Sequence, residues 1–354
     1  MEHPTEDALT GCLLGAALGD AIGLPWEGLS RSRVRRLMPD PLGHRFLLGR
    51  GMVSDDAEHA CMTAQALIVS AGDPAAFGAA LARQLRGWLL CAPAGIGLAT
   101  LRALLRLSAG VGWERSGVWS AGNGPAMRAP LLGVAFGGRP DRLRELVRIS
   151  TRITHTDPKA EQGALAIALA AHHAHLTARP DPAAYLANLR RALALDGGEI
   201  LALAERAAQS ADRGESTEAF ADSLGLQTGV GGYILHTVPV AVQAWLRHPD
   251  DFREAITAVV RCGGDTDTTA AILGGVLGAG LGAAGLPPDW RAGLAEWPRS
   301  PAWMARTARR LHTVLREGCR NAPEPLAWAA VLPRNLLFTA AVLAHGFRRM
   351  FPPY

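Results

Sequence analysis

The chain is poor in lysine, in aromatic side chains and in paired cysteines. Lysine occurs once, at Lys159, so 35 of the 36 basic residues are arginines, a bias typical of genomic base composition. The basic residues are scattered and the net charge is only +4, which argues against a nucleic-acid partner. The five cysteines are widely spaced without a Cys-x-x-Cys pair, which predicts reduced thiols and a cytoplasmic protein.

Several catalytic signatures are also missing. The sequence has no G-x-S-x-G elbow, no Walker loop and no H-E-x-x-H motif. A covalent serine or cysteine mechanism therefore has no support. The acidic first residues, and Asp20 inside the apolar run after them, argue against a signal peptide.

One uncharged run, residues 268–288, is long enough to cross a bilayer. It contains six glycines and directly follows an acidic cluster. We interpret it as a buried helix that neighbouring helices approach closely, and we expect no membrane span.

Helical periodicity dominates the chain, and convincing strands are absent. This pattern predicts an all-α, compact multi-helix domain over residues 1–320, with a C-terminal helical extension, residues 321–354, packed on it. The predicted helices cover residues 10–22, 57–71, 74–90, 95–108, 140–153, 159–178, 182–195, 198–209, 251–261, a helix from 268, 301–316 and 335–349.

Two acidic clusters carry most of the chemical information. Ser54-Asp55-Asp56 and Asp265-Thr-Asp267-Thr268 each combine two carboxylates with a hydroxyl ahead of an apolar helix. Either cluster alone is typical of a helix cap. If the two meet in space, their carboxylates repel unless a cation lies among them. Oxygen donors of this kind suit Mg²⁺, Mn²⁺ or Ca²⁺ and not zinc.

Four further features are candidates for a site, each with a plainer alternative. Glu27 follows Trp26 in a turn after a glycine-rich helix, where it is either an acid/base group or a solvated loop residue. His155 stands near a predicted helix start and Tyr233 follows a Gly-Gly pair, and each either contacts a ligand or packs. Asp20 is either a helix-terminal polar residue or a group that orients a ligating side chain.

A further candidate is the segment Gly122-Asn123-Gly124-Pro-Ala-Met127-Arg128. A Gly-Asn-Gly turn that leads into a helix offers backbone N–H groups to an anion, and Arg128 could complement a phosphate or carboxylate. The alternative is an ordinary turn.

Taken together, five blocks in this order resemble the ADP-ribosylglycohydrolase family, of the dinitrogenase-reductase-activating glycohydrolase type. They are GCLLGAALGD (11–20) with Glu27, SDD (54–56), GNGPAMR (122–128), THTD (154–157) and GGDTDT (263–268). The resemblance implies an all-α orthogonal bundle that hydrolyses ADP-ribosyl groups at the anomeric C1″ carbon. It implies ADP-ribose or an ADP-ribosylated substrate as the partner, and it is compatible with a monomer.

The resemblance also implies roles for particular residues. Two Mg²⁺ ions, with Mn²⁺ as the alternative, would be held by Ser54, Asp55, Asp56, Asp265, Asp267 and Thr268. The catalytic group would comprise Glu27, Asp55, Asp56 and Asp267. The substrate would contact Gly122, Asn123, Gly124, Met127, Arg128, His155 and Tyr233, with the diphosphate on the 122–128 loop.

The chain departs from the family pattern beside the first acidic cluster. Ser54 stands where a threonine is usual, and Ala57-Glu58-His59 replaces a second hydroxyl and its usual neighbours. A titratable pair beside the metals would indicate a different substrate or metal preference. A non-catalytic ADP-ribose-binding or toxin-immunity protein of the same fold is the alternative function.

Overall fold

The computed structural model of the chain describes residues 4–46, 48–177, 179–193, 197–349 and 351. Over these residues the protein is all-α, as predicted, with isolated β-bridges in place of strands. Its α-helices are α1 (Glu6–Gly23), α2 (Arg31–Leu37), α3 (Asp55–Ser70), α4 (Pro74–Leu89), α5 (Leu98–Ser108), α6 (Ala129–Phe136), α7 (Pro140–Arg152), α8 (Pro158–Leu176), α9 (Pro182–Leu193), α10 (Gly198–Asp212), α11 (Thr217–Ser223), α12 (Ile234–Arg247), α13 (Phe252–Arg261), α14 (Thr266–Leu281), α15 (Pro288–Gly293), α16 (Pro301–Glu317) and α17 (Trp328–Arg348). Two short 3₁₀ helices are η1 (Leu24–Trp26) and η2 (Ala126–Arg128).

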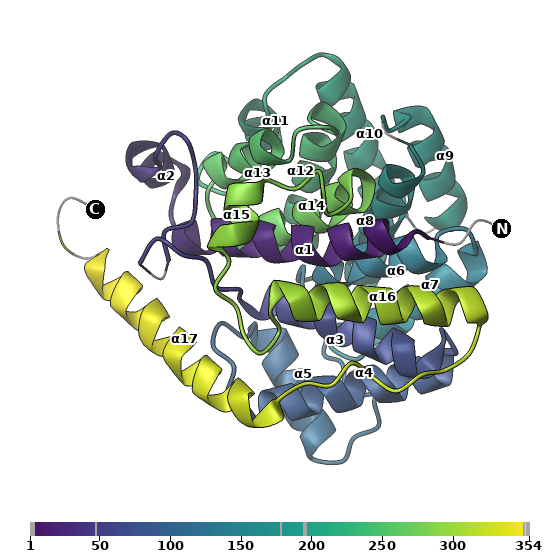
Figure 1. Cartoon of the computed structure of the whole chain (residues 1–354). Coiled ribbons are helices and arrows are strands. Elements are labelled where there is room, and N and C mark those ends of the chain that lie inside the picture. The colour runs from purple at the N-terminus through teal and green to yellow at the C-terminus, as the bar shows by residue number, and fades with distance from the viewer. Residues whose placement is uncertain (1–3, 47, 178, 194–196, 350, 352–354) are drawn as a thin grey trace.

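Helices α1 and α14 form the centre of the molecule and pack along each other's length (Figure 1). Glycines face one another along their contact: a Cβ atom built on Gly274 would lie 2.2 Å from the carbonyl oxygen of Gly15, and one on Gly15 would lie 2.1 Å from that of Gly274. Gly11 and Gly278 form an equally close pair one turn further along. The two backbones are therefore in direct contact, as predicted for the run from residue 268.

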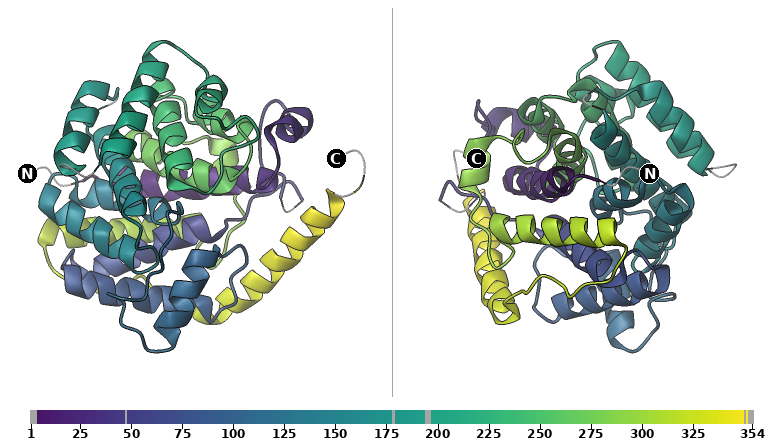
Figure 2. Two further views of the ribbon diagram at one scale, coloured as in Figure 1. Left: turned by 180° about the vertical axis from the view of Figure 1, so that it is seen from behind. Right: turned by 45° about the vertical axis from the view of Figure 1, so that its right-hand side comes forward.

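The remaining helices cover this central pair from two sides. Helix α1 also packs on α16 and α3, whereas α14 also packs on α8, α12 and α13 (Figures 1 and 2). Both central helices are buried along nearly their whole length, so the run from residue 268 is a core helix, as predicted.

Most predicted helices are found within a few residues of their expected bounds, but five helices were missed. Helices α2, α11 and α15 have six or seven residues, too few for a periodic pattern, and α6 is apolar on all sides. Helix α12 contains Pro239, which is typical of a helix break. The ends predicted at residues 178 and 195 lie outside the described residues.

The C-terminal helix α17 begins seven residues earlier than predicted, because Pro333 lies within it and not before it. Its buried side chains are Val331, Arg334, Asn335 and Phe338. By length and composition, Glu6–Trp26 and Trp328–Arg348 could each cross a membrane; the first is wholly buried in the core, whereas only 22% of the second is buried.

Gly274→Ala should destabilise the protein by roughly 2–3 kcal/mol, because the new methyl group would overlap the backbone of α1. This loss would occur although alanine is the better helix former by about 1 kcal/mol. Urea unfolding measures the difference. Gly138→Ala, where no atom lies within 4 Å of the built Cβ, is the matched control and should change stability little; equal effects at both positions would contradict backbone contact as the cause.

Candidate active site

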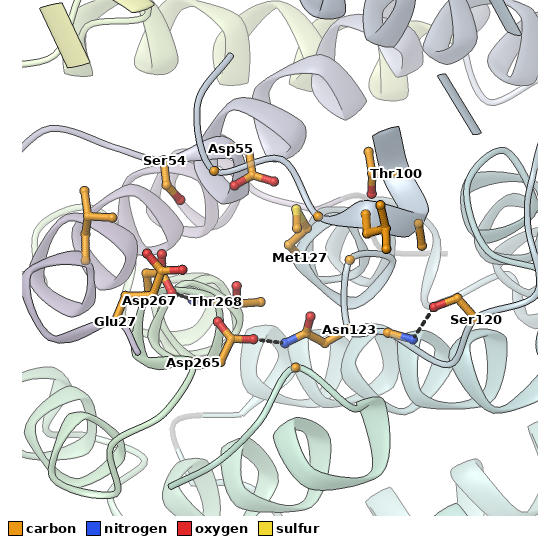
Figure 3. Close-up of a pocket in the computed structure, with 18 of the residues that line it drawn as sticks. Glu27, Ser54, Asp55, Thr100, Ser120, Asn123, Met127, Asp265, Asp267 and Thr268 are labelled. Atoms are coloured by element: carbon orange, nitrogen blue, oxygen red, sulfur yellow. Dashed lines mark hydrogen bonds between the residues drawn. The ribbon is translucent and has the colours of Figure 1, made fainter. Parts of the chain in front are cut away.

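A cavity of about 420 Å³ lies where the N-terminal ends of α3, α5 and α14 meet (Figure 3). This volume is within the range of sites for small molecules. Most of the predicted site residues line it: Glu27, Ser54, Asp55, Gly122, Asn123, Gly124, Met127, His155, Asp265, Asp267 and Thr268. In Figure 3 the carboxylates of Glu27, Asp55 and Asp267 lie toward one end of the cavity, and Thr100 and Ser120 lie toward the other.

The buried carboxylate of Asp20 organises the start of α3. Its oxygens accept the backbone N–H groups of Ser54, at 2.9 Å, and of Ala57, at 3.1 Å. Burial raises the pKa of Asp20 to about 7, although these hydrogen bonds lower it. Asp20 therefore holds Ser54 and Asp55 in place without lining the cavity, which agrees with its orienting interpretation.

The Gly263-Gly264 pair brings the second acidic cluster to the same cavity. Both glycines have positive φ, and Gly264 lies so close to Val230 that a Cβ atom would be 2.2 Å from its carbonyl oxygen. The backbone N–H of Asp265 donates to the same carbonyl oxygen at 2.7 Å. The turn thus brings Asp265 and Asp267 to the start of α14.

The two acidic clusters, more than 200 residues apart in the sequence, are joined by a hydrogen bond. The Thr268 hydroxyl donates to Asp56 Oδ2 at 3.1 Å, and the Ser54 hydroxyl donates to the same oxygen at 3.1 Å. The other oxygen, Asp56 Oδ1, is buried without a hydrogen-bond partner. A buried, unpartnered carboxylate oxygen is costly unless a proton or a cation satisfies it.

Electrostatic strain is concentrated at this junction. Burial raises the pKa values of Asp55, Asp56 and Asp267 well above the usual value, and neighbouring carboxylates raise them further. The largest charge contributions come from Asp20 on Asp55, from Asp55 on Asp56, and from Glu27 on Asp267. The raised pKa values mean that protonation would relieve this repulsion, and a bound divalent cation would relieve it as well.

The donor chemistry of this cluster fits a hard cation. It offers only carboxylate and hydroxyl oxygens, the ligands that Mg²⁺ prefers, and one of them is the unpartnered Asp56 Oδ1. Among the described residues no three His, Cys, Asp or Glu side chains form a ready-made metal site. An ion would therefore draw on the Ser54 and Thr268 hydroxyls and on side-chain adjustment as well as on the carboxylates.

Asn123 links the loop of residues 122–128 to the acidic end of the cavity. Its Nδ2 donates to Asp265 Oδ2 at 2.7 Å, a contact visible in Figure 3, and to Thr237 Oγ1 at 3.0 Å. Its backbone N–H donates to the Gly232 carbonyl at 2.9 Å. These bonds fix the loop against both α12 and the start of α14.

His155 is buried at the cavity wall beneath this loop, and its Nδ1 is 2.9 Å from Thr154 Oγ1. Burial, followed by the nearby charge of Arg128, lowers its pKa to about 3. The imidazole is therefore neutral at neutral pH, so it can position a ligand by hydrogen bonding but brings no positive charge.

Glu27 follows η1, and its carboxylate joins the acidic end of the cavity. Burial and then the charge of Asp265 raise its pKa, whereas Arg349 and a hydrogen bond with Asp267 lower it. A carboxyl group at the acidic end of a cavity, with its pKa shifted upward from the usual value, suits acid/base chemistry.

Three predicted site residues do not line the cavity. The guanidinium of Arg128 is fully buried behind it and donates to Ser150, to Thr154 Oγ1 at 3.0 Å and to His59 Nδ1 at 2.9 Å. The prediction that Arg128 contacts an anion is therefore not supported by its position: Arg128 supports the loop from behind, and Gly122, Asn123, Gly124 and Met127 face the cavity. Tyr233 accepts a hydrogen bond from Lys159 Nζ at 3.1 Å outside the cavity lining, and Asp56 lies beneath the lining.

The side chains of Glu58 and His59, where the chain departs from the family pattern, also lie outside the cavity lining. Glu58 is buried, forms an ion pair with Arg299 and accepts the Trp88 indole N–H at 2.7 Å. His59 packs edge-on against Trp88, with ring centroids 4.8 Å apart. This pair supports the packing of α3 on its neighbours, so it does not change the residues that face a ligand.

Other residues of the cavity lining were not predicted, because they have no chemical signature in the sequence. Those from the core fold are Leu24, Gly95, Gly97, Leu98, Ala99, Thr100, Ser120 and Gly232; those from the C-terminal helix are Phe338 and Val342. Small, apolar and hydroxyl residues are too common for a pattern to single them out.

Comparisons with known proteins agree on one family. A family model described as ADP-ribosylglycohydrolase matches residues 1–321. The chain is 33% identical over 303 residues to an uncharacterized protein of Archaeoglobus fulgidus, covering 82% of this chain and 92% of that one. It is 25% identical over 293 residues to ADP-ribosyl-[dinitrogen reductase] glycohydrolase of Rhodospirillum rubrum, covering 80% and 89%. A solved structure, an ADP-ribosylglycohydrolase-related protein complex, matches with a TM-score of 0.62 and 27% identity over 88% of this chain and 98% of that one.

Asp267→Asn should raise the melting temperature of chelator-treated protein at neutral pH, because it removes one of several repelling buried carboxylates. The same substitution should reduce or abolish the rise in melting temperature that Mg²⁺ produces in the unsubstituted protein. Differential scanning fluorimetry with Mg²⁺ and with EDTA measures both effects. Asp250→Asn, at an exposed position, is the control and should change neither; a full Mg²⁺ response in Asp267→Asn would exclude Asp267 as a ligand.

Proposed function

Because the chain belongs to the ADP-ribosylglycohydrolase family, we propose that it is a divalent-cation-dependent hydrolase that cleaves ADP-ribosyl groups at the anomeric C1″ carbon. The observation that carries the proposal is the meeting, in one cavity, of the Ser54–Asp56 cluster, the Asp265–Thr268 cluster and the Asn123 loop. Family membership supports ADP-ribosyl hydrolysis; the cation dependence and the bond cleaved are our inference.

Two Mg²⁺ ions, with Mn²⁺ as the alternative, fit the donor set formed by Ser54, Asp55, Asp56, Asp265, Asp267 and Thr268. When bound, such ions would neutralise the carboxylates and orient ribose hydroxyls and a water molecule. Asp20 would keep Ser54 and Asp55 in register through its two backbone hydrogen bonds.

The loop of residues 122–124 and neutral His155 would bind the diphosphate and adjoining ribose through backbone and imidazole hydrogen bonds. Asn123, tied to Asp265, would couple that loop to the acidic end, where C1″ would lie. In this arrangement the reacting carbon would lie among Glu27, Asp55 and Asp267.

In the reaction, water oxygen bonds to C1″ as the bond from C1″ to the leaving group breaks. Positive charge develops on the ribose ring, and the surrounding carboxylates stabilise it. One water proton is accepted by a carboxylate of the site, and the leaving group takes up a proton. Glu27, a carboxyl group of the cavity lining whose pKa is shifted upward, is our candidate for this exchange.

The proposal is tested by incubating the protein with Mg²⁺, Mn²⁺ or Ca²⁺ and a panel of ADP-ribosylated arginine, serine, nucleic-acid and small-molecule substrates. We expect ADP-ribose release from at least one linkage, and a loss of about 100-fold or more in Asp267→Asn. The Asp250→Asn control should retain full activity. Absence of release from every linkage would contradict the enzymatic function, and calorimetric ADP-ribose binding without turnover would favour a non-catalytic binding protein.

A further inference from the structure

Helix α17 completes the cavity although it lies beyond residue 321, where the family match ends. Phe338 and Val342, one turn apart on this helix, both line the cavity. Figure 1 shows α17 running along the edge of the molecule as a strap, with its C-terminal end near α2.

Near its N-terminal end, α17 is held to the backbone of the residue that precedes the first acidic cluster. Arg334 is buried and donates to both carboxylate oxygens of Glu296, at 2.9 and 2.7 Å, and to the carbonyl oxygen of Val53. Glu296 in turn accepts the Val53 backbone N–H at 3.1 Å. Both backbone polar groups of the residue before Ser54 are thus satisfied by the Arg334–Glu296 pair.

A second anchor holds the far end of α17 to the turn that carries Glu27. His345 Nε2 donates to the carbonyl oxygen of Pro25 at 3.1 Å, and Arg349 donates to the carbonyl oxygen of Glu27 at 3.0 Å. Because both ends are fixed, the stretch between them, which bears Phe338 and Val342, is held as a rigid wall.

This wall stands at the carboxylate end of the cavity. Phe338 belongs to an apolar cluster with Leu24, which precedes Glu27 by three residues, and with Phe46, at a ring-centroid distance of 5.5 Å. Ala94 packs at the edge of the same cluster, and the next residue, Gly95, lies against Asp55. The leaving group of a substrate whose C1″ lies among the carboxylates would therefore meet α17.

We propose that Phe338 and Val342 determine specificity by limiting the size of the group attached to C1″. This inference rests on the proposed function. The preferred substrate would be an ADP-ribose derivative with a small leaving group. A substrate attached to a folded protein would be disfavoured, because the protein would have to fit past α17.

Val342 offers the sharper test, since it is partly exposed and its substitution removes little of the core. The ligands are ADP-ribose and a peptide that carries ADP-ribose through a non-hydrolysable bond, both measured by calorimetry with Mg²⁺. Val342→Ala should strengthen peptide binding relative to ADP-ribose by about tenfold, and Val342→Trp should weaken it by a similar factor. Leu336→Ala, on the outer face of the same helix, is the matched control and should leave the ratio unchanged.

The inference would be overturned if the ratio of peptide affinity to ADP-ribose affinity were unchanged in both Val342 variants, or if Leu336→Ala changed it equally. The affinity for the peptide relative to ADP-ribose is measured by binding, so it decides this inference even if no linkage is hydrolysed. If the Val342 variants changed this ratio as expected but no turnover occurred, the result would count against the proposed reaction alone. If the unsubstituted protein bound the peptide as tightly as ADP-ribose, the wall would also be excluded.

The outer face of α17 carries a second and independent feature. Leu332, Leu336, Leu343 and Phe347 recur at helical spacing and are all exposed, Leu343 to 67%. Leu48, which is 99% exposed, lies across a groove from Ala344 and Arg348. A continuous apolar face of this kind is typical of an interaction surface.

The charged side chains of the two segments beside this face are all arginines. Residues 328–354 contain no carboxylate and three arginines, of which Arg334 is buried in its ion pair with Glu296 and Arg348 is exposed. Residues 41–52 contain Arg45 and Arg50 and again no carboxylate. Arg45 and Arg348 line the groove between the two segments. An apolar helix face flanked by arginines fits an anionic lipid surface, whereas a second copy of the chain would bring no carboxylate on this face to pair with them.

We infer that the outer face of α17, with Leu48, binds peripherally to anionic membranes. The full-length protein should sediment with vesicles of phosphatidylglycerol and phosphatidylcholine, and much less with phosphatidylcholine alone. Leu336→Glu with Leu343→Glu should weaken the binding by roughly tenfold or more, whereas Leu105→Glu, at an exposed leucine of α5, should not. No sedimentation with anionic vesicles would overturn the inference, as would light scattering that shows a dimer dissociated by the double substitution without vesicle binding.

Discussion

The close approach of α1 and α14 determines where the functional groups of this protein lie. Glycines on both helices remove the side chains that would otherwise separate their axes, so the backbones touch. Asp20 and η1 lie at one end of α1, and Asp265 and Asp267 lie at the adjoining end of α14. Close packing of two buried helices is therefore what places charges from distant parts of the sequence side by side.

The cost of that arrangement is charge repulsion among buried carboxylates. Burial raises the pKa values of Asp55, Asp56 and Asp267 well above the usual value, and the neighbouring carboxylates raise them further. The protein keeps these groups in place with neutral donors: the Ser54 and Thr268 hydroxyls, the Asn123 amide and backbone N–H groups. Neutral donors fix the geometry without cancelling the charge, which leaves the cluster suited to a cation. The arginines near the site, Arg128 and Arg334, are instead used to hold loops and helices from behind.

Helix α17 shows how a segment outside the family domain can become part of the site. Its inner face satisfies the backbone of Val53 and the turn of Glu27 and supplies two cavity residues, whereas its outer face is apolar and exposed. The same helix therefore forms part of the cavity wall and part of the exposed surface of the molecule.

The sequence by itself determined the helical class, the two acidic clusters and the glycine-rich contacts, because periodicity, caps and small-residue spacing are local properties. It also indicated Glu27, Asn123 and His155, which have chemically distinctive side chains. Only the tertiary structure decided that Arg128 faces away from the cavity, that Glu58 and His59 serve packing, and that Phe338 and Val342 complete the wall. These outcomes depend on which face of a helix meets which neighbour across hundreds of residues, and no local pattern specifies that choice.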